Sequence, residues 1–139
     1  MKNYKNTFDT LMKEMGKVVV GQNDIIEQIM VAILCDSNAL LEGYPGLAKT
    51  LAVRTISELF DLEFSRIQST PDLMPSDITG TYIIEDNDGK RKFKFQPGPV
   101  FANIVLVDEI NRATPKTQSA LLESMQEKQV TVGSETFKL

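Results

Sequence analysis

The chain has 139 residues, 42% of them hydrophobic and 24% charged, as is usual for a single soluble globular domain. Its net charge of −4 argues against a surface that binds nucleic acid as a whole, and leaves open a local basic patch. One cysteine and no histidine exclude an internal disulfide and a zinc site of cysteine and histidine ligands.

The first fifteen residues are polar and lack the apolar stretch of a signal peptide, and no apolar run is long enough to span a bilayer. We therefore expect a cytoplasmic protein without a membrane segment. The one cysteine, Cys35, lies in an apolar helical run, where we expect it to pack as a small hydrophobe.

The first third of the chain is predicted to be helical. Apolar residues at helical spacing indicate an amphipathic helix over residues 4–15, and a turn at Gly21 separates it from a second helix that starts near Asp24. Asp24 and Glu27 have the spacing of a capping box. The stripe that the second helix should bury consists of Ile25, Ile26, Ile29, Met30 and Ile33.

Strands and helices then alternate along the chain. Residues 39–41 are predicted to form a short buried strand, and a glycine-bearing loop follows over residues 43–50. A helix is predicted from about Lys49 to Phe60, and a second strand over residues 63–68. Residues 70–80 are predicted to be a loop, because Pro71, Pro75 and Gly80 interrupt them.

Two hairpins and one more strand–helix pair complete the pattern. Residues 82–84 and 93–95 flank a turn signal and predict the first hairpin. The continuous apolar run 104–107 is typical of a strand buried on both faces of a parallel sheet. Thr114 and Pro115 should start a helix that reaches about Lys128 and buries Leu121, Leu122 and Met125. Val130, Val132, the Gly133-Ser134 turn and Phe137 predict the second hairpin.

This order of elements predicts an α/β fold with a parallel sheet flanked by helices, into which the two hairpins are inserted.

The strongest chemical signal is the sequence GYPGLAKT over residues 43–50, between a predicted strand and an amphipathic helix. A phosphate-binding loop needs converging backbone N–H groups, which requires glycine where the chain turns back, and a helix N-terminus beside the phosphates. Lys49 would place a positive charge on the outer phosphates, and the Thr50 hydroxyl would ligate Mg²⁺. Ala48 replaces the second glycine of the general pattern, at a cost of roughly 1 kcal/mol if the backbone there has positive φ. The alternative is an ordinary Gly-Pro turn before a helix.

The second signal is the pair Asp108-Glu109 at the end of the apolar strand 104–107. Adjacent carboxylates at the end of a buried strand are costly unless they bind something. In P-loop enzymes the aspartate holds Mg²⁺ and the next carboxylate activates the attacking water. Many strands end in acidic residues that are exposed to solvent, so the pair alone is a weak signal. It indicates a metal site because a phosphate-binding loop is predicted upstream, over residues 43–50.

Several longer sequences resemble MoxR-type AAA+ proteins, from about Val18 to near the end of the chain. They are VVGQ at 19–22, GYPGLAKT at 43–50, RIQ at 66–68, TPDLMPSD at 70–77, GPVFAN at 98–103, DEINRA at 108–113 and PKTQSALLE at 115–123. Members of that family carry alanine at the position of Ala48. The resemblance implies a P-loop NTPase (AAA+) core, with residues 1–139 as the N-terminal part of the ATPase domain.

The resemblance also implies a site for ATP and Mg²⁺. Lys49 and Glu109 would be catalytic, and Thr50 and Asp108 would hold the metal. Val19, Val20 and Gly21 would border the adenine, and the other nucleotide-binding residues would be Gly43, Tyr44, Pro45, Gly46, Leu47, Ala48, Lys49, Thr50 and Leu51.

Three further features have alternatives that the sequence leaves open. Gln68 would hold Glu109 in an inactive rotamer, or it is a plain polar residue at a strand end. Arg112 would lie near a subunit interface, or it is a solvated arginine. The segment 129–139 resembles the hairpin that this clade inserts after its second core helix and presents to a client in the pore of a ring.

The family's fourth strand with its sensor residue, the arginine finger, the fifth strand and the helical lid have no counterpart before Leu139. We therefore expect a truncated core: a fragment that is marginally stable or partly swapped with another copy when alone. The relatives imply a homo-oligomeric, hexameric ring that remodels a protein client, often with a von Willebrand factor A domain protein. The alternatives are an MCM-like DNA motor, which the acidic composition argues against, and a nucleotide-binding switch without turnover.

Overall fold

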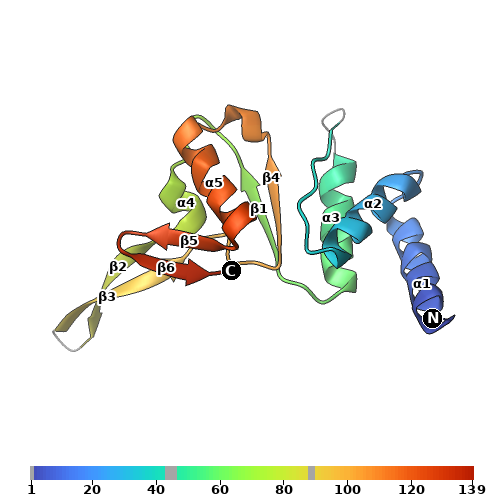
Figure 1. Cartoon of the computed structure of the whole chain (residues 1–139), viewed down its shortest axis with the longest axis horizontal. Coiled ribbons are helices and arrows are strands. Elements are labelled where there is room, and N and C mark those ends of the chain that lie inside the picture. The colour runs from blue at the N-terminus through green and yellow to red at the C-terminus, as the bar shows by residue number, and fades with distance from the viewer. Residues whose placement is uncertain (1, 43–46, 88–89) are drawn as a thin grey trace. The chain divides into compact units, whose positions relative to one another are not determined.

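Helices form the first part of the chain and paired strands the second (Figure 1). The computed structural model describes residues 2–42, 47–87 and 90–139, and the backbone divides into two units, Met1–Glu63 and Phe64–Leu139. Each unit is described by itself below. No helix among the described residues is long and apolar enough to cross a membrane.

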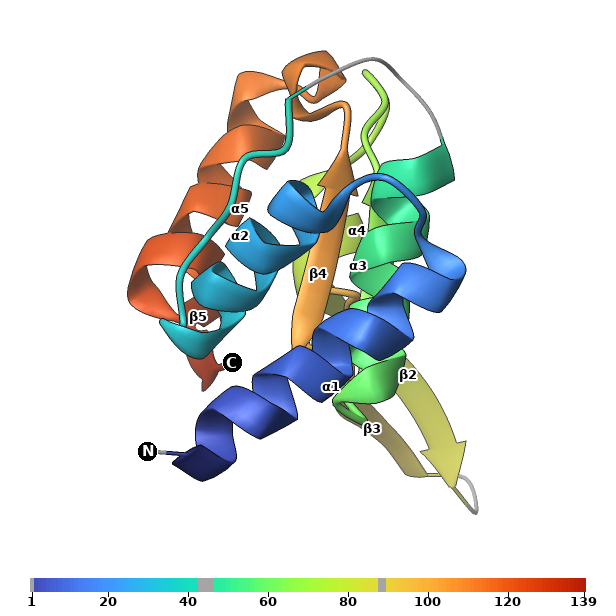
Figure 2. The same cartoon turned by 90° about the vertical axis from the view of Figure 1, so that its right-hand side faces the viewer.

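The first unit consists of three helices, α1 (Lys2–Val18), α2 (Asn23–Leu34) and α3 (Leu47–Leu59), shown together in Figure 2. Their apolar faces meet in one core, as the helical periodicity predicts. The buried side chains of this core are Met15, Val19, Ile26, Ile29, Met30, Ala52, Val53 and Ile56.

The predicted strand over residues 39–41 is wrong. Residues 37–42 have no regular structure, and Leu40 is 77% exposed. A strand is stabilised by a hydrogen-bonded neighbour, and none of the described strands pairs with this segment. An apolar run by itself therefore did not suffice to make a strand.

Two predictions about α2 are also wrong. The helix begins at Asn23, and its N-cap residue is Gln22, whose side chain makes no capping hydrogen bond. Asp24 is therefore not at the N-cap position, and the Asp24–Glu27 capping box does not form. Asp24 still lies in the first turn, where its charge favours the positive end of the helix. Cys35 is exposed, because it is the residue at which the helix ends and its side chain leaves the buried stripe.

The second unit is built on two parallel strands, β1 (Phe64–Gln68) and β4 (Ile104–Asp108). They pair in register from Phe64 opposite Ile104 to Gln68 opposite Asp108, and run in the same direction in Figure 1. The four apolar residues of β4 are half-buried, which corrects the prediction of a strand buried on both faces. The described sheet holds only these two strands, so β4 has a strand neighbour on one edge only.

One face of the β1–β4 pair carries the core of this unit. The core includes Ile67 of β1 and residues from α4 (Pro75–Thr79), α5 (Pro115–Glu127) and the hairpin of β5 (Gln129–Val132) and β6 (Glu135–Lys138). The buried members are Ile67, Ile78, Val100, Leu121 and Val130. Of the residues that α5 was predicted to bury, Leu121 is buried, whereas Leu122 and Met125 are 51% and 41% exposed.

The short helix α4 lies inside the segment that was predicted to be a loop. Pro75 occupies its first turn, and Asp77 accepts a hydrogen bond of 2.9 Å from the backbone N–H of Met74. Proline was interpreted as a helix breaker here, but it is well tolerated in the first helical turn, where its missing N–H costs nothing.

The long hairpin of β2 (Gly80–Asn87) and β3 (Lys90–Pro97) is closed at its base by two glycines. A β-carbon on Gly98 would overlap the backbone of Ile78 and Gly80. Gly80 itself has φ of +96°, which favours glycine. The G-P-V sequence at 98–100 therefore has a structural role, because it lets the returning chain approach α4 closely.

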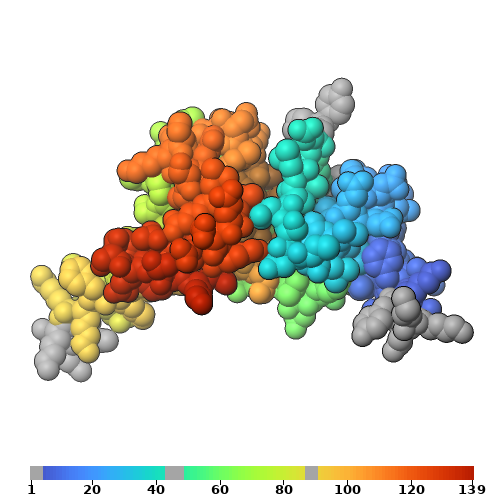
Figure 3. Space-filling view, viewed as in Figure 1, coloured from blue at the N-terminus to red at the C-terminus, as the bar shows by residue number. Residues whose placement is uncertain are grey.

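An aromatic cluster, defined as Tyr82, Phe95, Phe101 and Phe137, joins the two hairpins. The rings of Phe95 and Phe137 are stacked, with centroids 4.1 Å apart and planes at 9°. Beyond this cluster the β2–β3 hairpin projects from the rest of the unit, as its yellow surface in Figure 3 shows, and Phe93 is 77% exposed there. The two hairpins are thus one connected structure at their bases.

Candidate functional site

The acidic end of β4 is the first part of the candidate site. Asp108 is the last residue of the strand, and its side chain is 25% exposed. Glu109 follows directly and precedes a single 3-10 turn, η1 (Ile110–Arg112). Both carboxylates of the predicted Asp108-Glu109 pair are therefore located at the carboxyl end of a parallel strand, where ligands of α/β proteins bind.

The backbone of Glu109 is left-handed, with φ of 54° and ψ of 45°. This conformation costs a non-glycine residue roughly 1–2 kcal/mol. Three other non-glycine residues of the described chain have positive φ: Asp36, Asp61 and Lys128. They lie just after helices, and a left-handed residue is a common way for a helix to end. Glu109 follows a strand instead, and such strain concentrates at functional sites.

Each carboxylate is held by side chains of the same unit. Arg66 approaches Asp108 Oδ2 with two nitrogens, Nε at 2.7 Å and a terminal guanidinium nitrogen at 2.6 Å. Glu109 Oε2 accepts hydrogen bonds from Gln68 Nε2 at 3.3 Å and from Arg112 at 2.7 Å. The hypothesis that Gln68 contacts Glu109 thus has a matching hydrogen bond, and Arg112 is an internal partner of Glu109 here.

The phosphate-binding sequence belongs to the other unit. Gly43, Tyr44, Pro45 and Gly46 lie outside the described residues, as do the side chains of Leu47 and Ala48. Lys49 and Thr50 are in the first turn of α3 and are half-buried, and the next residue, Leu51, is 43% exposed. Lys49 Nζ donates to the carbonyl of Leu41 at 3.4 Å, so the two ends of the loop lie close together.

The residues expected to border the adenine surround a bend between α1 and α2. Val19 is 3% exposed and part of the helical core, while Val20 is 84% exposed. Gly21 has φ of +82°, a value that favours glycine.

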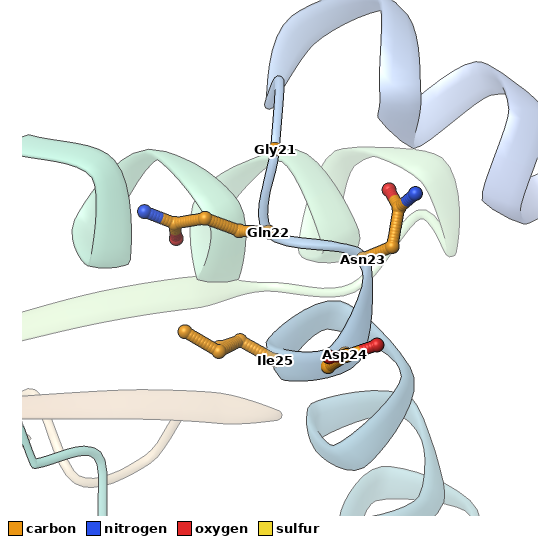
Figure 4. A pocket seen from close by; sticks show the side chains of 5 residues that line it. All are labelled: Gly21, Gln22, Asn23, Asp24 and Ile25. Atoms are coloured by element: carbon orange, nitrogen blue, oxygen red, sulfur yellow. The ribbon is translucent and has the colours of Figure 1, made fainter.

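A hollow of about 370 Å³ lies beside this bend, lined by Gly21, Gln22, Asn23, Asp24 and Ile25 (Figure 4). In Figure 4 the side chains of Gln22 and Asn23 point in opposite directions from the chain. The buried Oε1 of Gln22 has no hydrogen-bond partner, so it is an acceptor that a ligand could satisfy.

The predicted site residues therefore form two groups, one in each unit. Asp108, Glu109, Gln68 and Arg112 form one group in the second unit. Lys49 and Thr50 form the other at the start of α3. The approach of these two groups to each other across a nucleotide stays a prediction.

Arg66 contacts Asp108, a role that was not predicted from the sequence. A signal was present, because residues two apart on a strand point to the same face, which places Arg66 beside Gln68. The contact with Asp108 also depends on the register of β1 with β4, which a sequence pattern does not give.

Comparison with known proteins then decides the family. Residues 38–139 match the family described as "ATPase family associated with various cellular activities (AAA)". Chaperone MoxR1 of Mycobacterium tuberculosis is 48% identical over 134 residues, and Protein MoxR of Methylorubrum extorquens is 32% identical over 132 residues. The chain belongs to the MoxR-type AAA+ ATPases.

A solved structure supports the same assignment. A crystal structure from Cytophaga hutchinsonii, described as that of a candidate ATPase, is 52% identical and superposes with a TM-score of 0.85 over 99% of this chain. The predicted α/β P-loop fold of the AAA+ type is thereby confirmed. The match to the Mycobacterium protein spans 96% of this chain and 35% of that protein. The match to the Methylorubrum protein spans 91% of this chain and 37% of that protein, and this chain covers 41% of the Cytophaga chain.

Proposed function

We propose that this MoxR-type chain binds ATP with Mg²⁺ and contributes the hydrolytic carboxylate of an AAA+ ATPase. The observation that carries the proposal is the pair Asp108 and Glu109 at the end of β4, with Glu109 in a strained backbone conformation and held by Gln68. The family match supports it, because the family is one of ATPases.

The Asp108 carboxylate fits a magnesium ion that is shared with phosphates and that takes the place of Arg66. Mg²⁺ in nucleotide sites usually takes one or two carboxylates and completes its shell with phosphate and water. Asp108 offers one carboxylate, and no group of three metal-ligating side chains in the described ranges could form an all-protein cage. With the hydroxyl of Thr50, Asp108 would hold the ion, which when bound offsets the charge of the phosphates.

The remaining roles follow from the chemistry of the side chains. Lys49, at the start of α3, neutralises the outer phosphates as a point charge. Glu109 accepts the proton of the attacking water. The hydrogen bond from Gln68, with that from Arg112, holds Glu109 Oε2 and makes Gln68 a restraint on the resting site. We also propose that Val19, Val20 and Gly21 border the adenine.

The first test is a magnesium-dependent ATP-binding titration of Lys49→Ala. Affinity should fall about tenfold or more, because a hydrogen bond to a charged group contributes about 1.5–3 kcal/mol. Lys17→Ala is a matched control, since Lys17 is an exposed lysine whose salt bridge is with Glu14 of its own helix. Equal affinity for the Lys49→Ala protein and the parent would refute the phosphate-binding role.

The second test separates binding from turnover in the full-length protein. Glu109→Gln should keep ATP binding and lose about a hundredfold or more in turnover, the usual worth of a positioned general base. Full turnover by Glu109→Gln would refute the catalytic role of Glu109.

We further propose that the full-length protein assembles as a hexameric ring of identical subunits and remodels a protein client, with a von Willebrand factor A domain protein as partner. The name of the Mycobacterium relative, a chaperone, supports this role. The measurement is the mass of the assembly in solution with ATP. A monomer at all nucleotide concentrations would contradict it.

A further inference from the structure

A continuous chain of hydrogen bonds links the two carboxylates through β1. Arg66 donates to Asp108 Oδ2, and its terminal nitrogen also donates to Gln68 Oε1 at 3.1 Å. Gln68 in turn donates from Nε2 to Glu109 Oε2. The proposed metal ligand and the proposed catalytic base are therefore connected by two side chains of one strand.

The sheet register fixes this arrangement. Arg66 and Gln68 are two residues apart on β1 and share the face opposite to Ile67, which is buried in the core. Gln68 lies directly opposite Asp108, and Arg66 lies opposite Leu106. Arg66 thus reaches diagonally to the neighbouring strand, which its long side chain allows.

Arg66 and Glu109 together determine which end of the Gln68 amide faces Glu109. A guanidinium can only donate hydrogen bonds, and a carboxylate can only accept them. With Arg66 on one side, the oxygen of Gln68 must face Arg66 and its NH₂ group must face Glu109. Without Arg66 the oxygen of Gln68 loses this donor, so the amide is held at its NH₂ end only and the restraint on Glu109 weakens.

We propose that Arg66 is a positioning residue that couples the Asp108 carboxylate to the restraint on Glu109. Arg66 and a divalent cation compete for Asp108, because both are positive and both need the same carboxylate. A cation at Asp108 therefore favours release of Arg66, and the release of Arg66 weakens the hold of Gln68 on Glu109. This inference rests on the proposed function, in which Asp108 holds the cation.

The strength of the competition between Arg66 and the cation depends on how exposed the Arg66–Asp108 ion pair is. The side chains of Arg66 and Asp108 are 49% and 25% exposed, so solvent screens part of their attraction. Ion pairs of this kind change an equilibrium by roughly two- to fivefold. Removal of Arg66 should tighten cation binding by about that factor.

The experiment uses three variants in the full-length protein, with Mn²⁺ as a spectroscopic substitute for Mg²⁺ and a non-hydrolysable ATP analogue. Arg66→Met removes the charge and the hydrogen bonds. Arg66→Lys keeps the positive charge but loses the planar guanidinium group, whose nitrogens contact both Asp108 and Gln68. Arg91→Met is the matched control, because Arg91 is an exposed arginine of β3 and its loss changes the net charge equally.

Two quantities are measured for each variant: the midpoint of the Mn²⁺ titration, and the side-chain amide NMR signal of Gln68, assigned from its loss in Gln68→Ala. Arg66→Met should lower the midpoint about two- to fivefold and shift the Gln68 signal. Arg66→Lys should keep the midpoint of the parent and still shift the signal. Arg91→Met should change neither. Circular dichroism verifies that each variant is folded.

The results separate this inference from the proposed function. An unchanged or raised midpoint in folded Arg66→Met, or an unchanged Gln68 signal in both Arg66 variants, would overturn the coupling role. If instead the parent itself shows no Lys49-dependent nucleotide binding, the proposed function fails first. A titration of the parent and Lys49→Ala therefore precedes the other measurements.

Discussion

Replacement of Phe95 by alanine tests whether the aromatic cluster holds the two hairpins together. Phe95 contacts three other rings: Phe137 at a centroid distance of 4.1 Å, Tyr82 at 5.6 Å and Phe101 at 5.7 Å. The side chain is half-buried. A fully buried Phe→Ala change costs about 3–5 kcal/mol, so half of that is about 2 kcal/mol. The lost ring pairs add about 1 kcal/mol, for a total near 3 kcal/mol.

Phe93 provides a matched control on the same strand, two positions away. It shares the face of Phe95 but lies nearer the end of the hairpin and is 77% exposed, so Phe93→Ala should change the free energy of unfolding by less than about 0.5 kcal/mol. The assay is urea unfolding followed by near-ultraviolet circular dichroism, which reports aromatic packing. If Phe95→Ala and Phe93→Ala unfold at the same urea concentration, the cluster does not stabilise the unit and the reasoning is wrong.

Two further changes test local interactions of the second unit. The Tyr82 hydroxyl donates to Glu135 at 2.6 Å, and this hydrogen bond, with desolvation and the carboxylate charge, raises the pKa of Tyr82. Since the folded pKa is the higher one, the stabilising effect is complete below the ordinary tyrosine value near 10 and is lost as the pH rises through the raised pKa. Glu135→Gln should lower the pKa of Tyr82 in an absorbance titration, and an unchanged pKa would contradict the assignment. Gly98→Ala should destabilise the unit by more than about 1 kcal/mol in urea unfolding, because its β-carbon meets the backbone of Ile78; a neutral effect would show that the hairpin base can shift.

The outcome for the hairpins and helices shows what local chemistry can determine. Thr114 followed by Pro115 predicted the start of α5, and the Thr114 hydroxyl does accept a hydrogen bond from the backbone of Thr117. The Gly133-Ser134 turn likewise predicted the β5–β6 hairpin, whose strands pair from Gln129 to Val132. Such signals depend on residues that are neighbours in the chain, so they can be interpreted without knowing the fold.

Predictions that depended on distant partners fared less well. The sequence of residues 39–41 is as apolar as a buried strand requires, yet no strand in the described part of the chain pairs with the segment. Leu122 and Met125 have the character of core residues, but their side of α5 stays exposed. Apolar character shows that a side chain gains from burial, whereas the neighbouring elements decide whether burial occurs.

For the candidate site, the sequence alone identified the residues that we propose carry the chemistry: the loop before Lys49, and Asp108 with Glu109 at a strand end. Motif residues are recognisable because their type and spacing are set by the ligand. Only the tertiary structure decided that Arg66 bonds to Asp108 and that Gln68 faces Glu109. These contacts join positions about 40 residues apart, and they exist because β1 pairs with β4 in one particular register.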